Sequence, residues 1–267
     1  MRNSILILLI IFSSCGKIEE NSLLSDAESN SEFTLTKTSK SYTEKDSIWH
    51  IEKLKENYDS KKRLISSNDI TFYFYNSKNK IAKTKYINRR GRVTTIIQEN
   101  YIYNSKGNLV AVVRNGNSAG QDTLNHYKYD SNNNLTFEGN EYWQKKYKYS
   151  GKRLIEKQEI ENGKVEKISN YEYYQNGKVK TEDWVFGDRN RMRTYFTYYP
   201  NGKLFSERDS SFKKTNVPNE FVEFKTEYYY LKNDSLSRKK ELGRVFSEKE
   251  FKLRGYETYE YKKSNGL

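Results

Sequence analysis

The chain is poor in residues that build cross-links and metal centres. It has one cysteine, two histidines and two prolines among 267 residues. One cysteine excludes a disulfide framework and a zinc site made from several cysteines, and two histidines are too few for a multi-histidine metal centre. Hydrophobic residues reach only 34% even with tyrosine counted, against about 45–50% for a comparable set in an average globular domain. A thick aliphatic core and a metal site are therefore not expected.

Aromatic residues take the place of the missing aliphatic ones. The chain contains 24 Tyr, 13 Phe and 3 Trp. Each of these side chains can bury a large area, which argues against a wholly disordered chain. Thin, aromatic-rich layers of β-sheet are the best match to this composition.

The first fourteen residues have the pattern of a secretory signal peptide. Arg2 supplies a positive charge, and residues 5–12 form an unbroken apolar run that is too short to span a bilayer. The small residues Ser13 and Ser14 follow it and precede the only cysteine, Cys15. We therefore assign residues 1–14 to a signal peptide.

The segment FSSCG at this junction resembles the signal of bacterial lipoproteins. The resemblance implies that Cys15 is acylated, becomes the first residue of the mature chain and anchors it in a membrane. Gly16 differs from the Asp that retains some lipoproteins in the inner membrane, and Glu19 with Glu20 resembles a surface-export tag. The resemblance thus implies an outer-membrane location and an outward orientation. An ordinary secreted protein with an incidental cysteine is the alternative.

Composition divides the rest of the chain in two. Residues 16–47 contain seven acidic and four basic side chains and show no sustained periodicity, so residues 15–47 are interpreted as the lipidated Cys15 and a flexible tether. Residues 48–267 alternate short runs of Tyr, Phe, Ile, Val and Lys with Asn- and Gly-rich clusters, as in strands joined by hairpin turns. The run from Ile48 to Tyr58 also fits a short helix, but a strand is preferred.

One unit recurs along residues 48–267: a Tyr that closes a strand, a polar turn, and an apolar residue that opens the next strand. A spacing of six predicts a three-residue loop with a bulge, with Gly107, Asn133 and Asn79 suited to the left-handed position. A spacing of five predicts a direct cross-strand pair, with two-residue type I′ turns at Asn176-Gly177 and Asn201-Gly202. The six-residue pairs are Tyr58/Leu64, Tyr75/Ile81, Tyr103/Leu109, Tyr129/Leu135, Tyr230/Leu236 and Tyr261/Leu267, and the five-residue pairs are Tyr149/Leu154, Tyr174/Val179 and Tyr199/Leu204.

These units resemble two known repeats. YDSNNNLTFEG, YNSKGNLVAV and YDSKKRLIS are similar to the YD repeats of the RHS family, and YYPNGKLFSE and YYQNGKVKTE to a variant of the MORN repeat. Both families build extended β-sheet. We therefore expect an all-β fold: a repetitive antiparallel hairpin meander that forms an extended twisted sheet, with its last strand as an unprotected edge. The chain is too short to enclose another domain, so the shell function of large RHS proteins is not expected.

No catalytic motif is visible. The sequence has no nucleotide-binding loop, no G-x-S-x-G elbow and no H-E-x-x-H, and His50 and His126 lack a suitable partner residue. We therefore expect no catalytic residues, no cofactor and no enzymatic activity. A hydrolase would need a catalytic set that the sequence does not show.

The tyrosine surplus has two interpretations. In a thin sheet, Tyr covers the apolar face with its ring and leaves its hydroxyl in water, and this packing role is favoured because the Tyr recur at turn positions. The alternative is a stacking platform for sugar rings or a partner protein. Four aromatic residues lie outside the minimal repeat and form the candidate binding surface: Trp143, Trp184, Tyr198 and Phe205.

The net charge of +13 could indicate nucleic acid, but a secretory anchor argues against an intracellular role. An envelope protein or an anionic glycan is the more accessible partner, with the membrane bound through the lipid. The sequence predicts a non-enzymatic, outer-membrane lipoprotein that acts as a binding or structural module. The alternative is an immunity or accessory protein for a secreted toxin.

Overall fold

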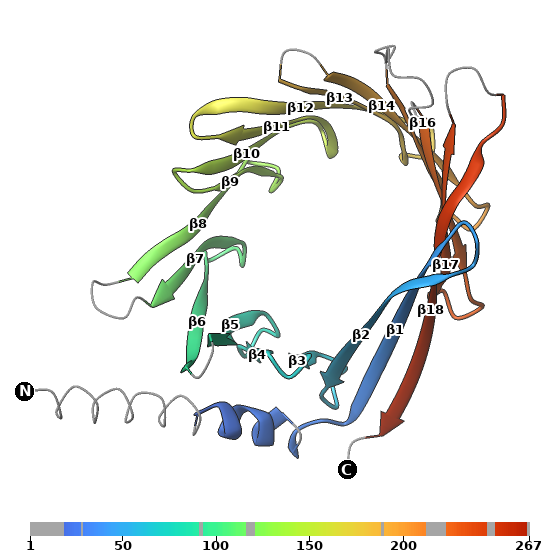
Figure 1. Ribbon diagram of the computed structural model, residues 1–267. Coiled ribbons are helices and arrows are strands. Elements are labelled where there is room, and N and C mark those ends of the chain that lie inside the picture. Colours follow the sequence, from blue (N-terminus) through green and yellow to red (C-terminus); the bar gives the residue numbers. More distant parts are fainter. Residues whose placement is uncertain are drawn as a thin grey trace, which may run out of the picture. The chain divides into compact units, whose positions relative to one another are not determined.

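The computed structural model describes residues 19–27, 29–90, 93–115, 121–187, 190–211, 223–244 and 249–265. In this part of the chain, one helix over residues 19–27 precedes eighteen β-strands (Figure 1). Cys15 and residues 1–14, which the sequence assigns to a signal peptide, lie outside the described residues. The strands are β1 (Phe33–Thr43), β2 (Ile48–Tyr58), β3 (Leu64–Ser67), β4 (Thr71–Tyr75), β5 (Ile81–Arg90), β6 (Val93–Tyr103), β7 (Leu109–Asn115), β8 (Gln121–Tyr129), β9 (Leu135–Gly139), β10 (Trp143–Ser150), β11 (Arg153–Glu161), β12 (Lys164–Tyr173), β13 (Val179–Phe186), β14 (Asn190–Tyr198), β15 (Leu204–Ser211), β16 (Glu223–Tyr230), β17 (Leu236–Arg244) and β18 (Lys252–Asn265).

The strands form one antiparallel sheet whose pairing closes on itself. Strands adjacent in sequence pair with each other, and β1 pairs with both β2 and β18, which makes the sheet an eighteen-stranded closed barrel by strand pairing. The prediction of an open, extended sheet is therefore wrong. The error comes from β1. Residues 33–43, assigned from the sequence to a flexible tether, form a strand that pairs with β18, so the last strand is not a free edge.

Within the sheet, the chain divides into two compact units. Unit 1 comprises the described residues of Met1–Lys37, Lys53–Asn125 and Tyr261–Leu267, and unit 2 those of Thr38–Glu52 and His126–Glu260. The run from Ile48 to Tyr58, for which a helix was the alternative, is strand β2.

One turn type recurs in seven of the hairpins. A Tyr closes the first strand, five loop residues follow, and an apolar residue opens the next strand; the fourth loop residue has a positive φ. The predicted pairs Tyr58/Leu64, Tyr75/Ile81, Tyr103/Leu109, Tyr129/Leu135 and Tyr230/Leu236 are confirmed. The left-handed residue is Lys62, Asn79, Gly107, Asn133, Gly177, Gly202 or Asp234. The pair Tyr261/Leu267 lies partly outside the described residues.

Two of the five-residue pairs are wrong by one position. Val179 pairs with Tyr173 rather than Tyr174, and Leu204 pairs with Tyr198 rather than Tyr199. Both turns therefore have the same five-residue loop as the others, and only the Gly of each Asn-Gly pair has a positive φ, which excludes a type I′ turn. Tyr149/Leu154 is confirmed as a five-residue pair.

Hydrogen bonds from four tyrosine hydroxyls join a repeat to the strand before it. The hydroxyl of Tyr75 donates to the carbonyl oxygen of Leu64, the residue that opens the preceding strand, at 2.8 Å. The same bond joins Tyr103 to Ile81, Tyr173 to Leu154 and Tyr198 to Val179, at 2.7–3.0 Å. These hydroxyls are structural and do not point freely into water.

The last loop residue adds a second connection between repeats. In four of the loops it is a Lys or Arg that lies over the ring of the next closing Tyr and donates a hydrogen bond to the left-handed residue of the next loop. The sets of cation, ring and acceptor are Arg63, Tyr75 and Asn79; Lys80, Tyr103 and Gly107; Lys178, Tyr198 and Gly202; and Lys203, Tyr230 and Asp234. These four basic side chains thus hold consecutive repeats together.

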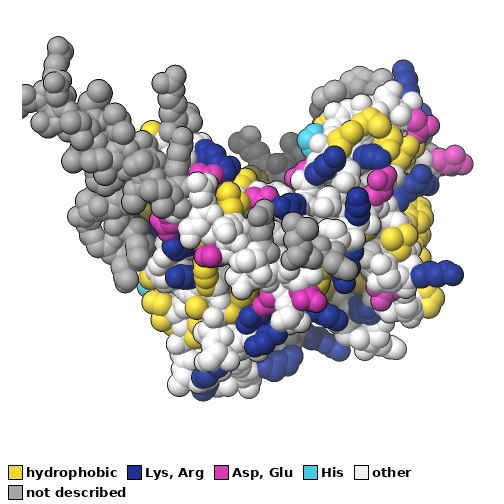
Figure 2. Space-filling model, turned by 90° about the horizontal axis from the view of Figure 1, so that it is seen from below, with side chains coloured by type: hydrophobic (Ala, Val, Ile, Leu, Met, Phe, Trp, Pro, Cys, Tyr) yellow, Lys and Arg dark blue, Asp and Glu magenta, His cyan; other side chains and the backbone are white. Residues whose placement is uncertain are grey.

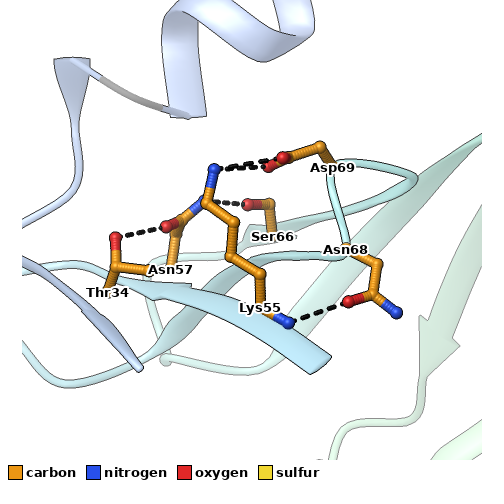
Figure 3. A network of polar contacts seen from close by, with 6 residues as sticks. All are labelled: Thr34, Lys55, Asn57, Ser66, Asn68 and Asp69. Carbon is orange, nitrogen blue, oxygen red and sulfur yellow. Dashed lines mark hydrogen bonds and ion pairs between the residues drawn. The ribbon is translucent and has the colours of Figure 1, made fainter. Parts of the chain in front are cut away.

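In unit 1, a buried polar network fixes the start of the sheet (Figure 3). Asn57 is 2% exposed; its side-chain oxygen accepts a hydrogen bond from Thr34 of β1, and its amide nitrogen donates to Ser66 of β3, each at 2.7 Å. A buried amide with both groups satisfied holds these three strands in one register, because any slip would leave it unpaired. Beside it, the backbone of Lys55 bonds to Asn68, where β3 ends.

No helix among the described residues is long and apolar enough to cross a membrane. The same residues contain no group of three His, Cys, Asp or Glu side chains arranged to hold a metal ion.

Candidate functional site: a cleft beside Trp49

The hairpin that joins β1 and β2, in unit 2, carries an exposed tryptophan, Trp49. A short turn closes it: the backbone N–H of Thr43 donates to Ser47, and Asp46 has a φ of 61°. The first residues of β2 follow, and Trp49 is 68% exposed, with Ile48 and Ile51 about half exposed. A large indole left in water at the start of a strand is a candidate contact for a ligand.

Trp49 borders an open cleft of about 390 Å³, which we call the Trp49 cleft. The cleft lies between the β1–β2 hairpin and strands β17 and β18. Its remaining lining residues are Ser41, Tyr42, Thr43, Glu44, Glu241, Arg254, Gly255, Tyr256 and Glu257.

Two stacked tyrosines form one wall. The rings of Tyr42 and Tyr256 lie 4.5 Å apart, centre to centre, with 10° between their planes. The Tyr256 hydroxyl donates to Asp46 at 2.9 Å, and this hydrogen bond raises the pKa of Tyr256. The turn of the hairpin thus fixes the orientation of the Tyr256 ring in this wall.

A glycine allows β1 and β18 to approach closely at the cleft. A Cβ atom at position 255 would lie 2.6 Å from the carbonyl oxygen of Tyr42, so any larger residue would push the two strands apart. The separation of β1 and β18 at the cleft therefore depends on Gly255.

Carboxylates outnumber cations in the cleft. Glu44, Glu241 and Glu257 line it together with a single arginine, Arg254. Lys239 lies 3.2 Å from Glu241 and 3.8 Å from Glu257, which holds these two carboxylates near each other. The cleft combines aromatic faces with hydrogen-bond acceptors, a set that suits a ligand with an apolar face and several hydroxyl groups.

The four aromatic residues selected from the sequence do not form one site. Each has a partner of its own: Lys145 lies over Trp143 and Lys167 over Trp184, at 5.6 and 4.5 Å. Tyr198 belongs to the repeat connections, and Phe205 packs edge-on against Tyr199 at 4.9 Å. Among the ring contacts of the described residues, none joins two of the four.

Sequence reasoning missed Trp49. It is one of only three tryptophans, and it stands at the start of a strand directly after a polar turn. That position could have marked it as exposed. Its partners could not have been found in this way, because Tyr42 and Tyr256 come from strands far apart in sequence.

The basic residues are not gathered in one patch on the face shown in Figure 2. Lys and Arg side chains there are interspersed with acidic and hydrophobic ones. Ion pairs are consistent with this distribution, because many bases on the sheet have an acidic partner. Examples are Arg193 with Asp183, Arg244 with Glu223 and Lys157 with Glu159. Much of the basic charge is therefore balanced locally.

No protein-family model matches the chain, and no curated protein is significantly similar to it. Several solved structures are similar in part. One is the TcdB2-TccC3-Cdc42 crystal structure, with 12% identity and a TM-score of 0.43 over 80% of this chain and 11% of that one. Another is a porin-like protein from Bacteroides uniformis, with 10% identity and a TM-score of 0.38 over 85% and 97% of the two chains.

A porin-like protein from Bacteroides vulgatus gives 12% identity and a TM-score of 0.38 over 84% of this chain and 97% of that one. The chain spans only about a tenth of the TcdB2-TccC3-Cdc42 chain that it matches. Identities and TM-scores of this size carry no information on function.

Proposed function

We propose that this protein is a non-enzymatic binding module of the bacterial outer membrane, anchored through Cys15, that holds a glycan in the Trp49 cleft. The observation that carries the proposal is the exposed indole of Trp49 beside the stacked pair of Tyr42 and Tyr256, in a cleft lined by carboxylates. The anchor is supported by the sequence around Cys15.

Sugar rings match this combination of groups. One face of a pyranose carries mainly C–H groups and packs on an aromatic ring, while its hydroxyls donate hydrogen bonds to carboxylate oxygens. Three carboxylates and one guanidinium line the cleft, and Lys239 pairs with Glu241 and Glu257, so the cleft offers no excess of positive charge to an anionic polymer. The proposed ligand is therefore a neutral glycan rather than the anionic one that the net charge of the chain favoured.

The test compares two exposed aromatic side chains of unit 2. Trp49→Ala removes the indole at the cleft, and Tyr142→Ala removes a side chain that is 64% exposed outside it. The mature protein is titrated with neutral oligosaccharides from the cell envelope and followed by calorimetry. Trp49→Ala should weaken binding at least about tenfold, a loss of ~1.4 kcal/mol, and Tyr142→Ala should leave it unchanged. Equal affinities for all three proteins, or no binding by any, would overturn the assignment of the cleft.

The anchor needs a separate test. Cys15→Ala should abolish incorporation of a labelled fatty acid and release the protein from the membrane fraction. Retention of both label and membrane association would contradict the assignment of Cys15.

A further inference from the structure

The helix over residues 19–27 is docked on unit 1. Leu23 and Ala27, one turn apart, are 6% and 7% exposed and pack against Phe72 and Ile87, which are also buried. This apolar contact holds the helix beside β4 and β5 (Figure 1). A segment that the sequence assigned to a flexible tether is therefore part of the folded body.

Two ion pairs fix the first turn of the helix. Glu19 lies 2.5 Å from the ammonium group of Lys85, and Glu20 accepts a hydrogen bond from Arg89 Nε at 3.0 Å. Both bases are on β5, and Arg89 is next to its last residue. Lys85 lies in the middle of β5 and Arg89 near its end, so Glu19 and Glu20 lie over the half of β5 that leads to Arg90.

The chain between this point and the anchor is short. Three residues lie between Cys15 and Glu19, and the four steps from one to the other span at most about 14 Å even when fully extended. A lipid on Cys15 would therefore keep the start of the helix, and the end of β5 beside it, close to the membrane surface.

The end of β5 has the side chains that a membrane surface binds. Arg90 is exposed, its cross-strand neighbour Val93 is 50% exposed, and Arg89 retains half of its side-chain exposure beside Glu20. We call Arg89, Arg90 and Val93 the β5 tip. Arginine binds phosphate oxygens through its planar fork, and an adjacent apolar side chain can enter the interface between head groups and acyl chains.

We propose that the β5 tip is a second membrane contact, in which Arg90 binds the phosphates of anionic lipid head groups while the acylated Cys15 inserts beside it. This inference rests on the proposed lipid anchor. It fixes an orientation of unit 1: the loop of residues 76–80, at the other end of β5, lies about 30 Å from the tip along the strand and faces away from the bilayer.

The test uses fluorescent probes at the two ends of β5. Cys15 is the only cysteine of the chain, so in the acylated protein an introduced cysteine would be the only free thiol. Thr95→Cys places a probe beside the tip, opposite Asn88, and Ser77→Cys places one in the loop of residues 76–80; both positions are exposed. The full-length acylated protein is reconstituted into vesicles of phosphatidylcholine and phosphatidylglycerol that contain a head-group quencher.

The probe at position 95 should be quenched several-fold more strongly than the probe at position 77. Arg90→Gln should reduce the quenching at position 95, and raising the salt concentration should do the same. Lys78→Gln, which removes an exposed charge at the far loop, should have no effect.

The outcomes separate the two proposals. Intact mass first establishes whether acyl chains are present, and a chain without them overturns both the anchor and the membrane contact. An acylated chain with equal quenching at the two positions overturns the membrane contact alone. If quenching at position 95 is the same after Arg90→Gln, and the same with and without phosphatidylglycerol in the vesicles, Arg90 does not bind lipid phosphates.

Discussion

The ammonium group of Lys178 lies 4.9 Å from the centre of the Tyr198 ring, in the next repeat along the chain. It also donates a hydrogen bond to the carbonyl oxygen of Gly202, beyond that ring. One side chain thus joins two consecutive loops by a cation–π contact and a charged hydrogen bond. The same arrangement at Arg63, Lys80 and Lys203 makes it a regular part of the fold.

Removing the charge of Lys178 should destabilise the sheet. Lys178→Met keeps most of the aliphatic stem but loses both the cation–π contact and the hydrogen bond, so the free energy of unfolding should fall by about 1 kcal/mol. Lys180→Met is the matched control, because Lys180 is exposed two residues further along the chain. Urea denaturation of the two variants measures the difference, and equal stabilities would show that the contact contributes nothing.

The left-handed loop position should respond oppositely in two repeats. Lys62 holds a φ of 60° with a side chain, so Lys62→Gly should stabilise the protein by a few tenths to about 1 kcal/mol. Gly177 has a φ of 82°, and a Cβ there would meet only the end of the Arg153 side chain, at 4.0 Å, so Gly177→Ala should cost about 1 kcal/mol through backbone strain. Thermal unfolding tests both, and a loss of stability in Lys62→Gly would contradict the shared turn geometry.

Glu207 and Glu227 should respond oppositely to neutralisation. Burial raises the pKa of Glu207, so its carboxylate opposes folding at neutral pH. Burial alone would also raise the pKa of Glu227, but hydrogen bonds from Lys225 and Tyr229 outweigh it and lower that pKa. Glu207→Gln should therefore stabilise the protein at pH 7, and Glu227→Gln should destabilise it.

The pH dependence gives the control. The pKa of Glu207 is higher in the folded chain than in the unfolded chain, where it is about 4.5. Its contribution to stability is therefore fully present below pH 4.5 and is lost as the pH rises through the pKa of the folded state. The advantage of Glu207→Gln over the parent should therefore shrink on acidification towards pH 4.5. Urea titrations at several pH values measure it, and an advantage that is independent of pH would exclude the carboxylate as its source.

The hairpins could be predicted because their information is local. A Tyr, five loop residues and an apolar residue are enough to specify a turn, as at Tyr75 and Ile81. The partner of Val179 was assigned wrongly because two adjacent tyrosines, Tyr173 and Tyr174, precede the Asn-Gly pair, and either could have closed the strand. Counting the five-residue loop of the other repeats would have selected Tyr173.

Closure of the sheet could not be predicted from such local patterns. Strand β1 has the sequence FTLTKTSKSYT, in which polar residues occupy both faces, so it lacks the alternation that marks a half-buried strand. Its contacts with β18 include the ion pair of Lys40 and Glu260, which joins residues 220 positions apart. The Trp49 cleft depends on the same long-range pairing and was missed for the same reason.

The closed pairing also restricts how such a chain can change in length. In a circuit where every strand runs antiparallel to both neighbours, the number of strands must be even. A duplication or deletion that adds or removes a single strand would leave either one parallel pair of strands or one pair of unpaired edges. Related genes should therefore differ by whole hairpins, and the natural unit of gain or loss is two strands together with the Tyr and the cation that join them to the next loop.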